Sequence, residues 1–450
     1  MISDRKERAT FSTKIGAVAA TVGSAVGLGN IWRFPYEAGA HGGGAFLLCY
    51  IAFVLVIGIP LLCAEFCIGR GTRSCVPEAF RKVEPSGKWH LTGYMVIATS
   101  LLILCFYSVV AGWTLEYCYS SVTGALNFNS TASGHDHFTD LISGSRNILW
   151  TAIFLLCNLG VLLGGVTKGI ERASNVLMPL LFVLLVVFCI NSFTLPGFRQ
   201  GMEFLFRPDF SAITPEVLLS AMGQAFFSLS LAMGCMMIYA SYFNKDSRLG
   251  RTATTTAVLD TLVAILAGVV IFPAVFSFGI SPSAGSALVF EVLPYVFANI
   301  PGGVIWSTLF FLLLFVATLT STISLSEISI SYFVEARKMS RRNATLLSTT
   351  IIFIGATLCA LSLGMVKELS ICGMTLFDFL DFVTSNICLP IIGFIVSIFV
   401  GWIVPRKFVK AQLTDNGSYR FGAYGLLMFS LRWICPGAIL LIFLNSIGII

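Results

Sequence analysis

The residues best suited to chemistry lie in short polar stretches of an otherwise apolar sequence. The first stretch, 23–30, holds three glycines and Asn30. Glycine loosens regular helix, and backbone that opens inside a membrane needs partners for its carbonyl and amide groups. Freed carbonyls and the Asn30 side chain supply the several oxygen ligands that a hard cation such as sodium prefers. Close packing through small residues is the structural alternative; Asn30 and the charged Arg33 favour a binding site.

Two further stretches offer hydroxyl groups. The second stretch, 226–234, has two serines and a loosening glycine: Ser228, Ser230 and Gly234. This signal is weak alone, because serine commonly joins membrane helices. The third stretch, 317–322, has four hydroxyls in five residues, more than packing requires. We expect Thr320 and Ser321 to complete a cation shell.

Ionisable residues inside apolar segments are functional candidates by default. Five carboxylates qualify: Glu65, Asp260, Glu327, Asp378 and Asp381. For Glu65 and Glu327 a structural hydrogen-bonding role is equally compatible with the sequence. Arg33 and the two aspartates near 380 are expected at matching depth, which predicts a gate above a central site.

The composition indicates a polytopic membrane protein. Of 450 residues, 56% are hydrophobic and only 11% are charged, so the chain cannot cover a soluble domain with charge. This excludes a secreted disulfide scaffold, a nucleic-acid binder and a coiled coil, and the net charge of +6 does not indicate an acidic partner. The thirteen cysteines are interpreted as packing residues. The charged N-terminal segment 1–13 lacks a short apolar core, so no removable signal peptide is expected.

A membrane-spanning helix needs about 20 apolar residues. We predict an all-α fold with eleven transmembrane helices, at 14–38, 43–69, 90–123, 148–164, 171–193, 214–243, 252–279, 302–335, 345–362, 376–403 and 422–448. Numbering the loops by side places 22 of the 28 Lys and Arg on the side of the N-terminus and 5 on the other. The positive-inside rule then predicts a cytoplasmic N-terminus and an extracellular or periplasmic C-terminus in the cell (inner) membrane.

Two outer connections are long. Segment 124–147 contains His135 and His137, a pair that could bind a metal, but no acidic or cysteine cluster surrounds it in the sequence and we expect a solvated loop. Segment 280–301 combines prolines and a glycine with an apolar middle, which predicts a structured, helical outer lid: Pro282, Gly285, Pro294 and Pro301.

The span order predicts an internal repeat within a single transmembrane domain, 1–450. Two consecutive units of five spans enter the membrane from opposite sides, so 14–193 and 214–403 would form an inverted pair, with 422–448 as an additional helix. Transporters built this way place their site at interrupted helices in corresponding positions of the two halves. The corresponding first helices, 14–38 and 214–243, are both interrupted.

The motifs closely resemble the neurotransmitter:sodium symporter family, whose structural prototype is the bacterial leucine transporter. The resemblance rests on GSAVGLGNIWRFP (23–35), GGGAF (42–46), GQAFFSLSLAMG (223–234) and ATLTSTISL (317–325), with Trp113 and Asp381. It covers essentially the whole chain. The prototype's twelfth helix is absent here, as in some other bacterial members.

The resemblance implies two sodium sites. The first would use the Ala25 carbonyl and the side chains of Asn30, Ser228 and Asp260, completed by a substrate carboxylate. The second would use three carbonyls and two hydroxyls, from Gly23, Val26, Ala317, Thr320 and Ser321. Asp260 stands where the family usually has Asn, and Ala264 stands where chloride-dependent members have a Ser that coordinates the anion. We infer that Asp260 replaces the chloride charge, so chloride is not expected as a cofactor.

The resemblance also implies a substrate site and gates. The Gly29 amide and the Tyr107 hydroxyl would meet a carboxylate. An ammonium would meet the hydroxyl of Ser230 and the carbonyls of Ala25, Phe227 and Ser228, with Ser321 adjoining. The side-chain pocket would be lined by Ile103, Met233 and Leu325, with Phe227 and Tyr107 as its lid. The outer gate would be Arg33 with Asp381, and the cytoplasmic gate Arg8, Tyr242 and Glu335.

Two further departures from the family pattern are visible. Phe11 replaces the usual gate tryptophan, a mild change. Ala232 replaces the glycine usual in the unwound segment, which is expected to narrow the pocket.

The sequence thus predicts sodium-coupled symport of a neutral, hydrophobic amino acid, with the amino acid, sodium ions and the lipid bilayer as partners. No nucleic acid is expected, and no oligomeric state is predicted. The alternatives are a sodium-coupled carrier of an amine or other small zwitterion, and a non-transporting membrane receptor or channel. Ser24 stands where amine carriers have an Asp, which favours a zwitterion. An enzyme is not expected, because the common hydrolase and phosphate-binding motifs are absent from the sequence.

Overall fold

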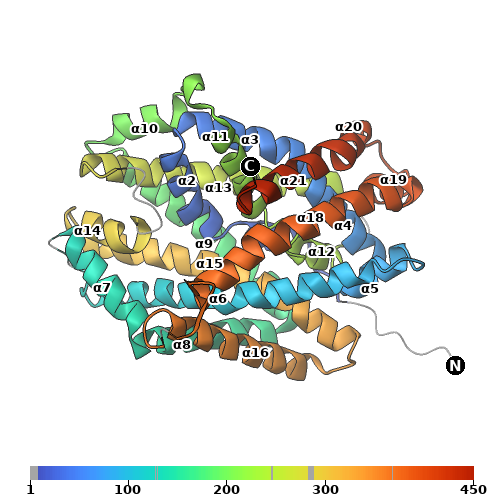
Figure 1. The fold of residues 1–450 in the computed structure, drawn as a ribbon, viewed down its shortest axis with the longest axis horizontal. Helices are drawn as coiled ribbons and strands as arrows, with labels where there is room; N and C mark the ends of the chain where they lie inside the picture. The colour runs from blue at the N-terminus through green and yellow to red at the C-terminus, as the bar shows by residue number, and fades with distance from the viewer. Residues whose placement is uncertain are drawn as a thin grey trace.

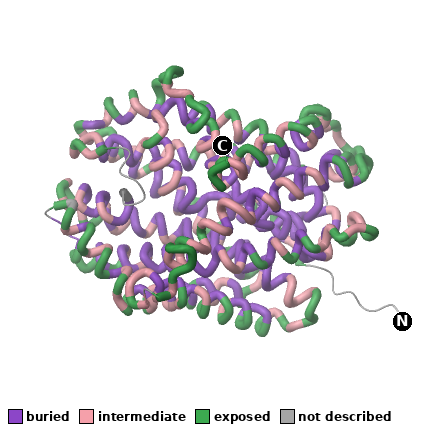
Figure 2. The backbone as a smooth tube through the Cα atoms, in the orientation of Figure 1, coloured by how far each residue is buried: buried purple, intermediate pink, exposed green. Residues whose placement is uncertain are grey.

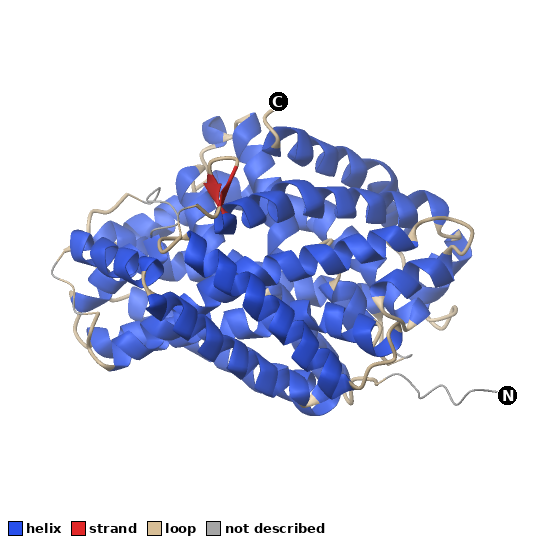
Figure 3. Cartoon of the chain, turned by 60° about the horizontal axis from the view of Figure 1, so that its bottom comes forward, coloured by secondary structure: helices blue, strands red, loops and turns tan. Residues whose placement is uncertain are grey.

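A computed structural model describes residues 9–126, 128, 130–244, 247–281, 288–366 and 368–449. Helices account for nearly all of this structure (Figure 3). Two short antiparallel strands, β1 (Ser370–Ile371) and β2 (Met374–Thr375), form a hairpin immediately before α17. The observed class is therefore the predicted all-α class.

The long helices match the predicted spans closely. Nine helical stretches in the described residues are long and apolar enough to cross a membrane. In chain order they are α3–η2–α4 (Gly44–Thr72), α6 (His90–Val122), α8 (Ser145–Leu163), η3–α9 (Val166–Ser192), α13 (Leu249–Ser277), α15 (Gly303–Glu335), α16 (Arg341–Ser362), α17–η6–α18–η7 (Leu376–Ile403) and α20–η8–α21 (Tyr424–Ser446).

The two remaining predicted spans are interrupted. Helix α1 (Lys14–Ala25) is followed by η1 (Gly29–Arg33) and α2 (Phe34–Ala40), and the two parts are bent by 51°. Helices α11 (Pro215–Ser228) and α12 (Cys235–Ala240) are separated by the non-helical residues 229–234. These pairs occupy the predicted spans 14–38 and 214–243, so all eleven predicted positions are helical.

Several spans contain a π-helical turn that precedes a proline. The turns η1, η2 (Val54–Gly58), η6 (Val383–Cys388) and η8 (Ser430–Ile434) each end two residues before one. Proline has no N–H to donate and its ring crowds the preceding turn, so the helix widens there. Two further π-helical turns, η5 (Leu288–Val292) and η7 (Phe399–Ile403), also end two residues before a proline, whereas η3 (Val166–Glu171) does not.

Short helices lie between the spans. They are α5 (Val76–Val83), α7 (Thr131–Ser143), α10 (Phe198–Phe206), the 3-10 turn η4 (Phe210–Ala212), η5 (Leu288–Val292), α14 (Leu293–Ala298) and α19 (Arg406–Thr414). The lid predicted at 280–301 is helical over 288–298, while Pro282 and Gly285 lie outside the described residues. The loop predicted at 124–147 is wrong, because residues 131–143 form α7, which begins at the N-cap Ser130.

Burial divides the molecule into a covered centre and an apolar periphery (Figure 2). The outer helices expose large apolar side chains such as Leu156, Ile190 and Leu426, which suits a surface that faces lipid. At the centre, α6 packs along α15 (Figure 1), α1 contacts α12, and η1 contacts α11. The two interrupted helices therefore meet inside the bundle.

Candidate functional site

The first break lies between α1 and η1, at residues 26–28. One of its backbone N–H groups finds a partner nearby in the chain, since the Gly27 N–H donates to Asn30 Oδ1 at 3.1 Å. The break glycines have ordinary backbone angles but close neighbours. A Cβ on Gly27 would lie 2.6 Å from Ser321 Oγ, and one on Gly29 would lie 3.2 Å from the Phe227 ring. These glycines allow the approach of α15 and α11.

The second break, residues 229–234, is held by left-handed backbone. Ser230, Ala232 and Gly234 have φ of 51°, 64° and 87°. The Ala232 N–H donates to Glu65 Oε1 at 2.7 Å, and the Ser230 hydroxyl donates to the Ser24 carbonyl at 3.0 Å. Glu65 is 1% exposed, so this carboxylate satisfies opened backbone, consistent with the structural role considered for it.

A small central cavity of about 40 Å³ lies where the two breaks meet. It is lined by nine of the ten predicted substrate-binding residues: Ala25, Gly29, Ile103, Tyr107, Phe227, Ser230, Met233, Ser321 and Leu325. Ser228 is not part of the lining. Sequence reasoning missed five lining residues: Gly27, Leu28, Phe106, Ser324 and Ser385. Ser24, the position where amine carriers have an Asp, also lines the cavity. Ala232 does not line the cavity, and its Cβ lies next to Gly393.

The side chains predicted for the first sodium site converge beside this cavity. Asn30 Nδ2 lies 2.9 Å from Ser228 Oγ and 2.8 Å from Asp260 Oδ1, and Ser228 Oγ lies 2.6 Å from Asp260 Oδ2. The Tyr50 hydroxyl joins them, 3.1 Å from Ser228 Oγ. All four side chains are at most 1% exposed. Tyr50 lies in an apolar run with no neighbouring polar motif, so sequence reasoning missed it.

The residues predicted for the second sodium site come from α1 and α15. The Ser321 hydroxyl donates to the Val26 carbonyl at 3.4 Å. The Thr320 hydroxyl donates to the Ala317 carbonyl, one turn back, at 3.0 Å. At Gly23 a Cβ would lie 3.3 Å from Met178, so α9 closes the far side of this region. An oxygen-rich seam thus joins the first break to α15.

The predicted outer gate residues lie near each other but have other partners. Arg33 Nε pairs with Glu37 Oε1 at 3.3 Å, and its guanidinium lies 4.8 Å over the Phe227 ring. Asp381 accepts from the Ser385 hydroxyl at 2.9 Å. Among the ion pairs of the described residues, none joins Arg33 to Asp381. A cavity of about 260 Å³ adjoins Arg33, Glu37 and Phe227.

Two of the three predicted inner-gate residues, Tyr242 and Glu335, lie in the described residues. Tyr242 Oη donates to Glu327 Oε1 at 2.6 Å, and Arg341 holds the same carboxylate with two contacts of 2.6 Å. Glu335 accepts from the Cys75 N–H at 2.7 Å. Arg8 lies outside the described residues. A cavity of about 1490 Å³, lined by Tyr242, Glu335 and Arg341, opens here.

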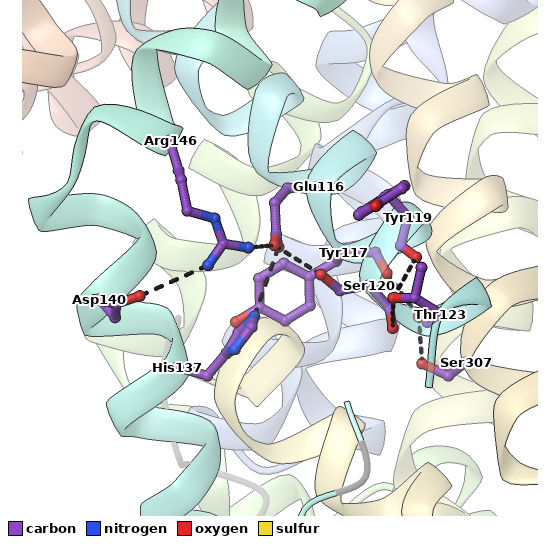
Figure 4. A network of polar contacts seen from close by, with 10 residues as sticks. Glu116, Tyr117, Tyr119, Ser120, Thr123, His137, Asp140, Arg146 and Ser307 are labelled. Carbon is purple, nitrogen blue, oxygen red and sulfur yellow. Dashed lines mark hydrogen bonds and ion pairs between the residues drawn. The ribbon is translucent and has the colours of Figure 1, made fainter. Parts of the chain in front are cut away.

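A separate polar network covers the opposite end (Figure 4). The buried Glu116 of α6 lies 2.5 Å from Arg146 Nη2 and 3.7 Å from His137 Nε2. His135, also on α7, contacts Glu291 of η5 at 2.9 Å. The Glu291 carboxylate raises the pKa of the exposed His135, through the hydrogen bond first and then through its charge. The two histidines therefore tie α7 to different elements, and no group of three metal-type ligands occurs in the described ranges.

Comparisons with known proteins agree with this geometry. The profile of the Sodium:neurotransmitter symporter family matches residues 8–146 and 137–450. An uncharacterized sodium-dependent transporter of Bacillus subtilis (strain 168), YhdH, is 37% identical over 98% of each chain. Sodium- and chloride-dependent GABA transporter 2 of Homo sapiens is 26% identical, over 98% of this chain and 80% of its own.

Among solved structures, the crystal structure of MhsT in complex with L-phenylalanine is 42% identical. The two folds agree with a TM-score of 0.89, over 98% of this chain and 100% of the other. The fold, the two broken helices and the family profile lead to one conclusion. The chain belongs to the sodium:neurotransmitter symporter family of multi-span membrane transporters.

Proposed function

We propose that this chain couples sodium entry to uptake of a neutral, hydrophobic amino acid by alternating access. The supporting observation is the central cavity, whose lining among the described residues combines the apolar side chains of Ile103, Met233 and Leu325 with opened backbone and hydroxyls but contains no charged residue. A charged substrate side chain would lack a charged partner there, at a cost of several kcal/mol. The L-phenylalanine bound to MhsT supports the same substrate class.

Two sodium ions are proposed. The first would be held by the Ala25 carbonyl with Asn30, Ser228 and Asp260, completed by the substrate carboxylate. The second would lie between the carbonyls of α1 and the hydroxyls of α15, at Gly23, Val26, Ala317, Thr320 and Ser321. Because ion and substrate would share one shell, each stabilises the binding of the other.

Chloride is not proposed as a cofactor. Asp260 and Ala264 are both fully buried and one helical turn apart on α13. A fixed carboxylate offsets the charge of two cations in a low-dielectric site, and an alanine offers no donor to an anion. Transport should run equally well when gluconate replaces chloride. Asp260→Asn should impair it, and Asp260→Asn combined with Ala264→Ser should recover activity only in chloride; strict chloride dependence of the unmodified protein contradicts this proposal.

The proposed orientation places the N-terminus in the cytoplasm and the C-terminus outside or in the periplasm, in the cell membrane. The repeat halves would be 14–193 and 214–403, each beginning with a broken helix. An amine substrate is the second candidate, but Ser24, which lines the cavity, gives an ammonium no carboxylate.

Uptake into proteoliposomes tests this function. With an inward sodium gradient, we expect uptake of leucine, methionine or phenylalanine, lost when the gradient is collapsed or potassium replaces sodium. Lysine and glutamate should compete poorly. Binding without gradient-driven accumulation would indicate a receptor, and competition by lysine or glutamate as strong as by leucine would overturn the substrate class.

A further inference from the structure

A buried carboxylate accepts hydrogen bonds from the segment that precedes α1. Glu171, at the end of η3, accepts from the Ser12 N–H at 2.8 Å and from the Ser12 hydroxyl at 2.7 Å. Its other oxygen accepts from the Thr13 N–H at 3.1 Å and from the Thr13 hydroxyl at 3.3 Å. Four hydrogen bonds to one ionisable group therefore connect the start of α1 to the start of α9.

The position of Glu171 suits this contact electrostatically and sterically. The carboxylate lies at the N-terminus of α1, where N–H groups are unpaired and the helix dipole favours negative charge. Glu171 is only 2% exposed, although its partners Ser12 and Thr13 are exposed. A Cβ on Gly16 would lie 2.2 Å from Glu171 Oε1, so only glycine leaves room for the carboxylate.

The same segment is attached on its other side to the chain after α12. The Phe11 N–H donates to the Tyr242 carbonyl at 2.9 Å, and Asn244 Nδ2 donates to the Phe11 carbonyl at 3.0 Å. The large cavity on the side of the N-terminus adjoins both the Glu171 contact and the Phe11 contact. Its lining includes Thr10, Val166 and Tyr242. Helix α1 begins beside this cavity and ends at the central cavity, whose lining includes Ser24 and Ala25.

We propose that Glu171 is a positioning residue for transport: it holds the N-terminal end of α1 against α9, and its four hydrogen bonds break when the central cavity opens toward the N-terminal side. This inference rests on the alternating-access function proposed above. Loss of the contact favours the conformation that is open on that side and leaves the residues around the central cavity untouched.

Two variants disturb the contact between Glu171 and the start of α1, one by changing Glu171 and one by changing α1. Glu171→Gln removes the charge, and Gly16→Ala displaces the carboxylate while leaving it charged. Glu203→Gln, at an exposed glutamate of α10, and Gly160→Ala, at a helical glycine with open space around it, are the matched controls. Gly16→Ala keeps the test valid if Glu171→Gln folds poorly, because alanine favours helix.

The readout is accessibility of the central cavity. Ser24→Cys places a thiol in the cavity lining. The background replaces the exposed Cys157 and Cys372 by serine, and also Cys75, which lines the large cavity on the N-terminal side. A membrane-impermeant maleimide is added to the N-terminal side of the membrane, and the labelling rate is measured in sodium and in potassium. A hydrogen bond to a charged group is strong enough to shift such an equilibrium on the order of tenfold.

We expect sodium to slow labelling of the parent. Glu171→Gln and Gly16→Ala should raise the rate in sodium on the order of tenfold, while both controls stay within about twofold of the parent. The proposal is overturned if sodium slows labelling of the parent and of the two variants equally. It is also overturned if Glu171→Gln and Gly16→Ala lower the thermal midpoint but leave the labelling rate unchanged. Failure of the proposed function appears differently, as a parent whose labelling does not respond to sodium.

Discussion

The two helix breaks are held open by different means. The first break carries three glycines in 23–29, yet none has a positive φ. These glycines provide room, because Ser321, Phe227 and Met178 lie where their side chains would be. The second break has left-handed backbone at Ser230 and Ala232, which are not glycines, and Glu65 binds the opened backbone.

The difference separates two costs of interrupting a helix in a membrane. In the first break the main requirement is steric, since the break must bring the Val26 carbonyl next to Ser321 and the Leu28 N–H next to the Tyr107 hydroxyl. In the second break the requirement is conformational, because left-handed backbone costs about 1–2 kcal/mol for an L-residue and its freed N–H groups need acceptors. Substitutions should therefore fail for different reasons in the two breaks.

The largest effect is expected at the acceptor of the second break. Glu65→Ala leaves the Ala232 N–H without its partner in a buried site, which costs about 1–3 kcal/mol, and the break should lose its defined shape. We expect a lower thermal midpoint in detergent together with loss of uptake. Glu65→Gln keeps an acceptor oxygen and should be milder; equal stability of Glu65→Ala and the parent would show that the backbone alone holds this break.

The next effect concerns room at the first break. Gly27→Ala places a Cβ 2.6 Å from Ser321 Oγ and 3.2 Å from the Tyr107 hydroxyl. Crowding of this kind costs about 1–3 kcal/mol, so the displaced hydroxyls should weaken sodium-dependent amino-acid binding by about tenfold. Helix propensity does not offset this cost, because Gly27 lies in the break between α1 and η1. Gly160→Ala is the control and should bind like the parent. Binding by Gly27→Ala that is as tight as that of the parent would contradict the steric role of Gly27.

A small stabilisation is expected at Ala232. Ala232→Gly relieves the left-handed strain but adds unfolded-state entropy, so the net gain should be below about 1 kcal/mol. Because Ala232 faces Gly393 rather than the cavity, the ranking of amino-acid substrates should not change. Competition assays in the variant and the parent test this, and a shift toward bulkier substrates would place Ala232 in the pocket.

The smallest effect lies outside both breaks, at α7. Glu291→Gln should lower the pKa of His135, which that carboxylate raises, as followed by histidine NMR. The His135–Glu291 attraction is present at low pH and is lost as pH rises through the raised pKa of His135. Sodium-dependent amino-acid binding by Glu291→Gln should equal that of the parent. A changed sodium dependence would show that the contact between α7 and η5 is coupled to the helix breaks.

The sequence predicted the spans well because each is a long apolar segment bounded by charge. Glycine and hydroxyl clusters likewise identified the breaks, and nine cavity-lining residues followed from the family resemblance, seven of them within the motifs that carry it. Partners distant in the chain could not be derived, since nothing local pairs Glu65 with Ala232 or Tyr50 with Ser228. α7 was missed because its residues are polar and a loop has the same composition. The Arg33–Glu37 pair was overlooked, although its spacing of four along a helix could have indicated it.

Reciprocal coupling tests the central claim that the two breaks build one site for ion and substrate. Equilibrium binding of radiolabelled leucine is measured across sodium concentrations, and sodium affinity is measured with and without leucine. Because linkage is reciprocal, each ligand should tighten the other by the same factor, on the order of tenfold or more. Leucine affinity that is identical in sodium and potassium would contradict the shared site.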